Sequence, residues 1–267
     1  MTASRFTAVD IRACKGVRPV VVLTAYDVLM AGLVDTTAEM ILVGDSLGMV
    51  RFGLPDTLGV SLEMMEHAAA AVQRGSSRAL VLVDLPFGSY EASPQQAFSS
   101  ASRLMRAGAG AVKLEGGAPM IDTVRFLTQR GIPVCGHLGL TPQSVHVLGG
   151  YKVQGRDAAS AEHLRRDAVA LAEAGAFALV LEAIPASLGK EITNSLSIPV
   201  IGIGAGVCDG QVLVSEDLLG LTPGKPPKFV KRYADIATTI KAAVAQFADD
   251  VRQGRFPDSA HSYSVHK

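Results

Sequence analysis

Eight short runs of apolar residues recur along the chain and constrain its fold more than any other feature. They lie in the stretches VVLTAYD, MILVGDS, ALVLVDLPF, AVKLEGG, PVCGHLGLT, ALVLEAI, VIGIGAG and QVLV. Most of these runs are nearly continuous in Val, Ile and Leu, which is typical of parallel strands buried on both faces. Ala-, Leu- and Glu-rich segments of helical period separate them, so the pattern predicts repeated strand–helix units.

The helical segments show start and stop signals. MIDTVRFLTQRG, SPQQAFSSASRLMRAGA and DAASAEHLRRDAVALAEAGA each reach a glycine near their end, as helices often do. Eight units in 267 residues favour an α/β fold of the (β/α)8 TIM-barrel type over an open doubly wound sheet. We predict one barrel domain, residues 1–267.

A last helix is predicted at about residues 233–253. Its apolar stripe consists of Ile236, Ile240, Val244, Phe247 and Val251. Because such a stripe must be covered, we predict that this C-terminal extension lies at a subunit interface.

Composition excludes several classes of partner. Lys plus Arg and Asp plus Glu both total 25, so no net charge attracts nucleic acid or an anionic membrane. No segment offers the roughly 18 apolar residues of a membrane span. The three cysteines have neither zinc-ligand spacing nor the density of a disulfide scaffold. We therefore expect a cytoplasmic protein with no nucleic-acid or membrane partner.

Polar, mostly acidic residues stand where six predicted strands end: Asp27, Asp45, Asp84, Glu115, His137 and Glu182. In a barrel these ends meet at one mouth, where active sites lie. Two like charges 4 Å apart repel by about 4 kcal/mol at an effective dielectric near 20, so the cluster predicts a divalent cation. Carboxylates without zinc-type ligands suit Mg2+, and Lys113, on the same strand face as Glu115, adds one positive charge.

Each residue also has a structural interpretation. Asp45 and Asp84 could be helix N-caps. Lys113 and Glu115 could form an ion pair in the barrel interior, and His137 could be a structural histidine. Taken together, their recurrence at one barrel mouth favours an active site.

Other candidates differ in strength. Asp27 is interpreted as a capping or supporting residue, since its strand can end at Thr24. Glu182 follows four apolar residues and is predicted to be a general base. The glycine loop Gly202–Gly206 is typical of a tight turn, with phosphate contact as the alternative. The basic run Lys225–Tyr233 is interpreted as a surface loop.

Several longer motifs occur in order: LTAYD, ILVGDSLGMV, DLPFGSY, AVKLEGG, GHLGLTPQSVH, GGYKVQGR, IGIGAG, CDGQVLV and PKFVKRY. From about Thr24 to Phe256 the chain resembles the ketopantoate hydroxymethyltransferase family. The resemblance implies a TIM barrel of the phosphoenolpyruvate/pyruvate type. It also implies a homo-oligomer, commonly a decamer.

The resemblance further implies a reaction. The enzyme would transfer a hydroxymethyl group from 5,10-methylenetetrahydrofolate to 3-methyl-2-oxobutanoate, forming 2-dehydropantoate and tetrahydrofolate in pantothenate biosynthesis. One Mg2+ per subunit, or another divalent ion, would stabilise an enolate of the oxo acid.

By the same resemblance, residues of this chain take roles. The implied metal ligands are Asp45, Asp84 and Glu115. The implied substrate-binding residues are Asp45, Ser46, Asp84 and Lys113. The implied catalytic residues are Glu182 as general base, Lys113, and His137, whose exact role is open.

The sequence departs from the family pattern at two places, and two other functions are compatible with its residues. The loop containing Leu54, Pro55 and Asp56 differs from the usual aspartate-serine-threonine run, and Glu216 replaces a common histidine. The rivals are another Mg2+-dependent, enolate-forming lyase or mutase of this barrel type, and a non-catalytic metabolite-binding barrel. The GHLGLTPQS and GGYKVQGR motifs favour the transferase.

Overall fold

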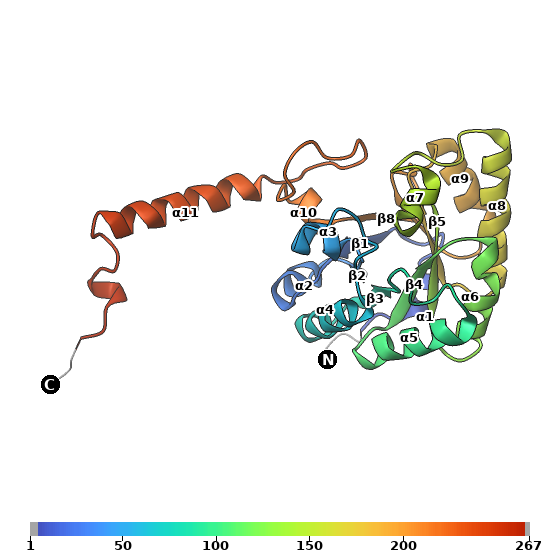
Figure 1. The fold of residues 1–267 in the computed structure, drawn as a ribbon, viewed down its shortest axis with the longest axis horizontal. Coiled ribbons are helices and arrows are strands. Elements are labelled where there is room, and N and C mark those ends of the chain that lie inside the picture. Colours follow the sequence, from blue (N-terminus) through green and yellow to red (C-terminus); the bar gives the residue numbers. More distant parts are fainter. Residues whose placement is uncertain (1–4, 265–267) are drawn as a thin grey trace. The chain divides into compact units, whose positions relative to one another are not determined.

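A closed, eight-stranded parallel barrel forms the larger part of the protein (Figure 1). The computed structural model describes residues 5–264, which group into two compact units, one ending at Ser215 and one beginning at Glu216. The strands are β1 (Val20–Thr24), β2 (Met40–Val43), β3 (Leu80–Asp84), β4 (Ala111–Glu115), β5 (Val134–Gly139), β6 (Ala178–Glu182), β7 (Val200–Ile203) and β8 (Gly210–Leu213). Each strand pairs in parallel with the next, and β8 closes on β1. The eight predicted strands and the TIM-barrel fold are confirmed.

Helices lie between the strands. They are α1 (Ala8–Arg12), α2 (Val28–Val34), α3 (Leu47–Phe52), α4 (Leu62–Gly75), α5 (Pro94–Arg106), α6 (Ile121–Thr128), α7 (Val145–Leu148), α8 (Ala158–Glu173), α9 (Ala186–Ser195), α10 (Ser215–Leu218) and α11 (Ile236–Arg252). Short 3-10 turns are η1 (Ala118–Met120), η2 (Pro142–Ser144) and η3 (Ser259–His261). The three helices predicted from the glycine-ended segments are α5, α6 and α8. No helix within residues 5–264 has both the length and the apolarity needed to cross a membrane.

Two apolar cores flank the strands. One fills the space between the strands and the helices around them. The other, smaller core includes Leu80 and Leu82 of β3, Ala111 of β4 and Ala178 of β6. Side chains two residues apart on a strand share a face. The residues that follow the smaller core at this spacing therefore point into the barrel interior, and these are Asp84, Lys113, Glu115, His137 and Glu182.

The second unit contains α11, close to the predicted range of 233–253. Asp235 caps this helix by accepting a hydrogen bond from the Thr238 N–H. Among the residues described, none within α11 is buried, and four members of its apolar stripe are exposed: Ile240, Val244, Phe247 and Val251. The subunit interface remains a prediction.

Candidate active site

Strand register brings the predicted residues together at the C-terminal mouth. Asp84 is the register partner of Lys113, and Glu115 is that of His137. Glu182 is opposite Gly139. Asp45 is the second residue after β2 and is buried, as are the charged residues of β3 and β4. Glu182 is the most accessible member, with 16% of its side chain exposed.

The structure excludes the capping interpretation of Asp45 and Asp84. Asp84 is the last residue of β3, and the N-cap position of α3 belongs to Ser46. Asp27 does cap a helix: β1 ends at Thr24, and the Asp27 carboxylate accepts the N–H groups of Leu29 and Met30 in α2.

Lys113 pairs with Asp84. Its Nζ lies 2.9 Å from Asp84 Oδ1, so the alternative that paired Lys113 with Glu115 is wrong. Asp84 Oδ2 accepts the backbone N–H of Asp45 at 3.1 Å. Gly44 leaves room for the Ser46 side chain, because a Cβ there would lie 2.9 Å from Ser46 Oγ.

His137 bridges two carboxylates. Its Nδ1 lies 3.2 Å from Glu115 Oε1 and 3.4 Å from Lys113 Nζ. Its Nε2 lies 3.2 Å from Glu182 Oε2. Burial and the Lys113 charge lower the pKa of His137, but contacts with the two glutamates outweigh them and raise it to about 9. The imidazole is therefore held as a cation between Glu115 and Glu182.

The carboxylates lack sufficient positive charge. Burial, followed by the charges of Asp84 and Glu115, raises the pKa of Asp45 to about 8. Burial also raises the pKa of Asp84, although Lys113 opposes this. The pKa of Glu115 is lowered, because His137, Lys113 and a backbone N–H outweigh its burial. Asp45 is therefore the carboxylate whose negative charge is least favourable in the folded protein, and a cation beside it would stabilise that charge.

Metal binding fits this donor chemistry without a preformed ligand cage. Within residues 5–264, no three Asp, Glu, His or Cys side chains are grouped as ready ligands. Mg2+ needs no such cage, because it keeps several waters and takes one or two carboxylates plus substrate oxygens. Asp45 and Asp84 supply such oxygens.

Sequence reasoning missed two buried residues of the site, Gln143 and Tyr90. Gln143, in η2, donates from Nε2 to Asp45 Oδ2 at 2.8 Å and through its backbone N–H to Glu115 Oε2 at 3.0 Å. The Tyr90 hydroxyl lies 2.6 Å from Gln143 Oε1. Both lie in quoted motifs, GHLGLTPQSVH and DLPFGSY. Their signal was only a polar side chain in a loop that follows a strand.

Backbone conformation fixes Glu182. Ala183, the next residue, has φ 46°, and it is the only residue other than glycine with positive φ in the described chain. Such a conformation costs about 1–2 kcal/mol and is found mostly where surrounding structure enforces it. The Ala183 N–H donates to Ile203 O, and its carbonyl accepts the N–H of Gln154. Gly139 is also required, because a Cβ there would lie 2.2 Å from Glu182 O.

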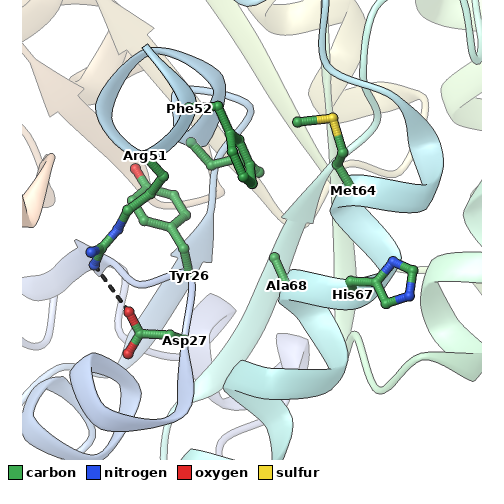
Figure 2. Close-up of a pocket in the computed structure, with 8 residues that line it drawn as sticks. Tyr26, Asp27, Arg51, Phe52, Met64, His67 and Ala68 are labelled. Atoms are coloured by element: carbon green, nitrogen blue, oxygen red, sulfur yellow. Dashed lines mark ion pairs between the residues drawn. The ribbon is translucent and has the colours of Figure 1, made fainter. Parts of the chain in front are cut away.

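A pocket of about 460 Å³ lies beside this site (Figure 2). It is lined by Tyr26, Asp27, Leu47, Arg51, Phe52, Met64, His67 and Ala68. Arg51 pairs with Asp27 at 3.1 Å, as the dashed line shows. The Tyr26 hydroxyl lies 2.9 Å from Ser46 Oγ, so a hydrogen bond links Ser46 to a residue that lines the pocket. None of the predicted catalytic or metal-binding residues lines this pocket.

Solved structures share the fold. A phosphonopyruvate hydrolase in complex with oxalate and Mg2+ superposes with a TM-score of 0.61 at 15% identity, covering 97% of this chain and 93% of its own. A 2,3-dimethylmalate lyase of the PEP mutase/isocitrate lyase superfamily gives 0.60 at 16% identity, covering 96% and 92%. At 15–16% identity, these similarities show that the barrel fold is shared.

Sequence relatives identify the family. The pattern of the ketopantoate hydroxymethyltransferase family matches residues 5–259. The 3-methyl-2-oxobutanoate hydroxymethyltransferase of Ruegeria sp. (strain TM1040) is 58% identical, covering 97% of this chain and 93% of its own. That of Bordetella petrii is 55% identical, covering 98% and 96%. The predicted resemblance and the assignment as a hydroxymethyltransferase are confirmed: the chain belongs to the ketopantoate hydroxymethyltransferase family.

Proposed function

We propose that this enzyme transfers a hydroxymethyl group from 5,10-methylenetetrahydrofolate to 3-methyl-2-oxobutanoate, forming 2-dehydropantoate and tetrahydrofolate. The names of its relatives support the acceptor. The structural observation that carries the proposal is Glu182, a partly exposed carboxylate at the mouth that lies beside the buried His137 and the other buried charged residues of the site.

The oxo acid presents a carboxylate and a keto oxygen, which need positive partners. Lys113 is buried and stays protonated, because the charges of Asp84, Glu115 and Asp45 raise its pKa against the effect of burial. It offsets negative charge on the substrate carboxylate or on the keto oxygen. Ser46, braced by Tyr26, offers a hydroxyl and a backbone N–H.

Asp45 and Asp84 would hold Mg2+, and Glu115 would be the third acidic partner. When bound, the cation supplies Lewis acidity toward the two oxygens of the oxo acid. The raised pKa of Asp45 supports this assignment, since a group whose charge is unfavourable alone becomes favourable beside a cation.

Glu182 acts as the base that takes the proton from C3 of the oxo acid. Its Oε2 lies 3.2 Å from His137 Nε2, so the other oxygen is available to the substrate. The electron pair left at C3 forms the new bond to the methylene carbon of the folate. Both bonds between the methylene carbon and the folate nitrogens break: one opens to give the iminium form that C3 attacks, and the other breaks as a water supplies the hydroxyl group. The C3 proton and the second proton of that water go to the two folate nitrogens, which gives tetrahydrofolate.

The test is deuterium uptake at C3 of 3-methyl-2-oxobutanoate in D2O, followed by NMR, with Mg2+ or with chelator. We expect exchange in the native enzyme with Mg2+ and loss of at least 100-fold in Glu182→Gln. Glu191→Gln is the matched control, because Glu191 lies on α9, is exposed, and pairs with Arg165 of α8. Exchange that is unchanged in Glu182→Gln would refute the base assignment.

If the native enzyme shows no exchange, the experiment is repeated with tetrahydrofolate present. This repeat is needed because proton removal would not occur without folate if folate had to bind before the oxo acid. Exchange that appears only then keeps the proposal. No exchange in either case contradicts the proposed reaction.

We also propose that the enzyme works as a homo-oligomer, a decamer, in the cytoplasm. The exposed stripe of α11 supports assembly, with Val244 61% and Phe247 56% exposed. The three cysteines are free, which suits a reducing compartment. Truncation after Tyr233 should reduce the oligomer mass in light scattering, and an unchanged mass would contradict the role of α11.

A further inference from the structure

Gln143 uses every polar atom of its side chain within the site. Its Nε2 donates one hydrogen to Asp45 Oδ2 at 2.8 Å and the other to Leu85 O at 2.9 Å. Its Oε1 accepts from the Tyr90 hydroxyl at 2.6 Å. The side chain is almost fully buried, at 6% exposure, so water cannot replace these partners cheaply.

Tyr90 fixes which way the amide faces. A phenol has one proton, and the 2.6 Å contact to Gln143 Oε1 takes it in preference to the Glu115 carbonyl at 3.3 Å. The Tyr90 oxygen accepts the Glu115 N–H at 3.2 Å, so its acceptor side is also engaged. A flipped amide would place Oε1 against two acceptors, Asp45 Oδ2 and Leu85 O, and would lose the bond from the Tyr90 hydroxyl. Asp45 therefore always meets an N–H donor.

The consequence is a defined rotation of the Asp45 carboxylate. Gln143 donates to Oδ2, so Oδ1 is the carboxylate oxygen that Gln143 leaves for another partner. The backbone N–H of Gln143 holds Glu115 Oε2 at the same time. One residue of the loop after β5 thus contacts two of the three carboxylates that the family resemblance implies as metal ligands.

We propose that Gln143, oriented by Tyr90, is a positioning residue that turns Asp45 so that its second oxygen is presented to a divalent cation. This inference rests on the proposed function. A support of this kind is typical of metal sites, where changing a residue that orients a ligand costs 10- to 100-fold in metal affinity.

The experiment measures Mn2+ binding by electron paramagnetic resonance of the free ion, with no substrate and no turnover. Gln143→Leu keeps the side-chain size and the backbone N–H to Glu115 but removes the donor to Asp45. We expect its Mn2+ dissociation constant to rise 10- to 100-fold. Tyr90→Phe keeps the ring but removes the hydroxyl that donates to the Gln143 amide, so we expect a smaller rise in the Mn2+ dissociation constant.

The control is Ser76→Ala. Ser76 is buried at the opposite end of the barrel, before β3, and its hydroxyl donates to Val72 O and accepts from Arg5. This variant should lose thermal stability with no change in Mn2+ affinity, as a purely structural residue would.

The outcomes separate the two claims. Native protein that binds Mn2+, with equal affinity in both site variants, overturns the role of Gln143 and leaves the proposed function intact. Native protein that binds no Mn2+ overturns the proposed metal site and this inference with it. If Gln143→Leu does not fold, Tyr90→Phe decides alone, because it removes only one hydroxyl.

Discussion

Replacing Asp45 by asparagine should stabilise the metal-free protein while it destroys the metal site. The buried Asp45 has a pKa of about 8, against an ordinary value of 3.8. The folded state therefore holds a proton that the unfolded chain releases, so folding loses stability as pH rises from about 4 to 8. At pH 7 this penalty is about 4 kcal/mol, at roughly 1.4 kcal/mol for each pH unit above the ordinary value.

Asp45→Asn removes the penalty, because the amide never ionises and its oxygen can still accept from Gln143. We expect the free energy of unfolding at pH 7 to rise by up to about 4 kcal/mol. At pH 4 the gain should nearly vanish, since this pH lies close to the ordinary pKa of 3.8 and the unfolded chain then loses little free energy by releasing the proton. The assay is urea unfolding followed by circular dichroism, with chelator present and the protein concentration fixed.

Asp35→Asn is the control with the opposite sign. Burial raises the pKa of Asp35, but the N–H groups of Ala79, Ser77 and Arg78 outweigh this and lower it. Its stabilisation is present above the ordinary pKa and is lost in acid, so the variant should lose about 2 kcal/mol at pH 7. An Asp45→Asn variant that gains nothing, or gains equally at pH 4 and pH 7, would refute the reasoning.

Two further predictions concern the same charges. Mn2+ affinity should rise close to tenfold per pH unit up to about pH 8 and then level, because the metal displaces the Asp45 proton. Calorimetry in buffers of different ionisation enthalpy should show this proton release. An Mn2+ affinity that does not change with pH would contradict the prediction. Lys113→Met should cost about 3–5 kcal/mol of unfolding free energy by leaving the buried Asp84 without its partner. Adding Asp84→Asn should restore much of that loss in urea unfolding, and no recovery would mean that the pair is not the cause.

The fold could be predicted because its signal is local. Each strand is a short apolar run, and burial on both faces of a parallel sheet requires that composition. The position of Asp27 as a helix cap also followed from the sequence, since its strand ends at Thr24 and the carboxylate reaches N–H groups only two and three residues ahead. Such contacts depend on few backbone angles.

The pairing of charges could not be predicted in this way. The sequence by itself determined that Lys113 and Glu115 share a strand face and that acidic groups end several strands, because side-chain direction alternates along a strand. Only the tertiary structure decided that Lys113 pairs with Asp84, that His137 bridges two glutamates, and that Gln143 reaches Asp45 from 98 positions away. The physical reason is that barrel closure and strand register set these distances, and both are properties of all eight strands together.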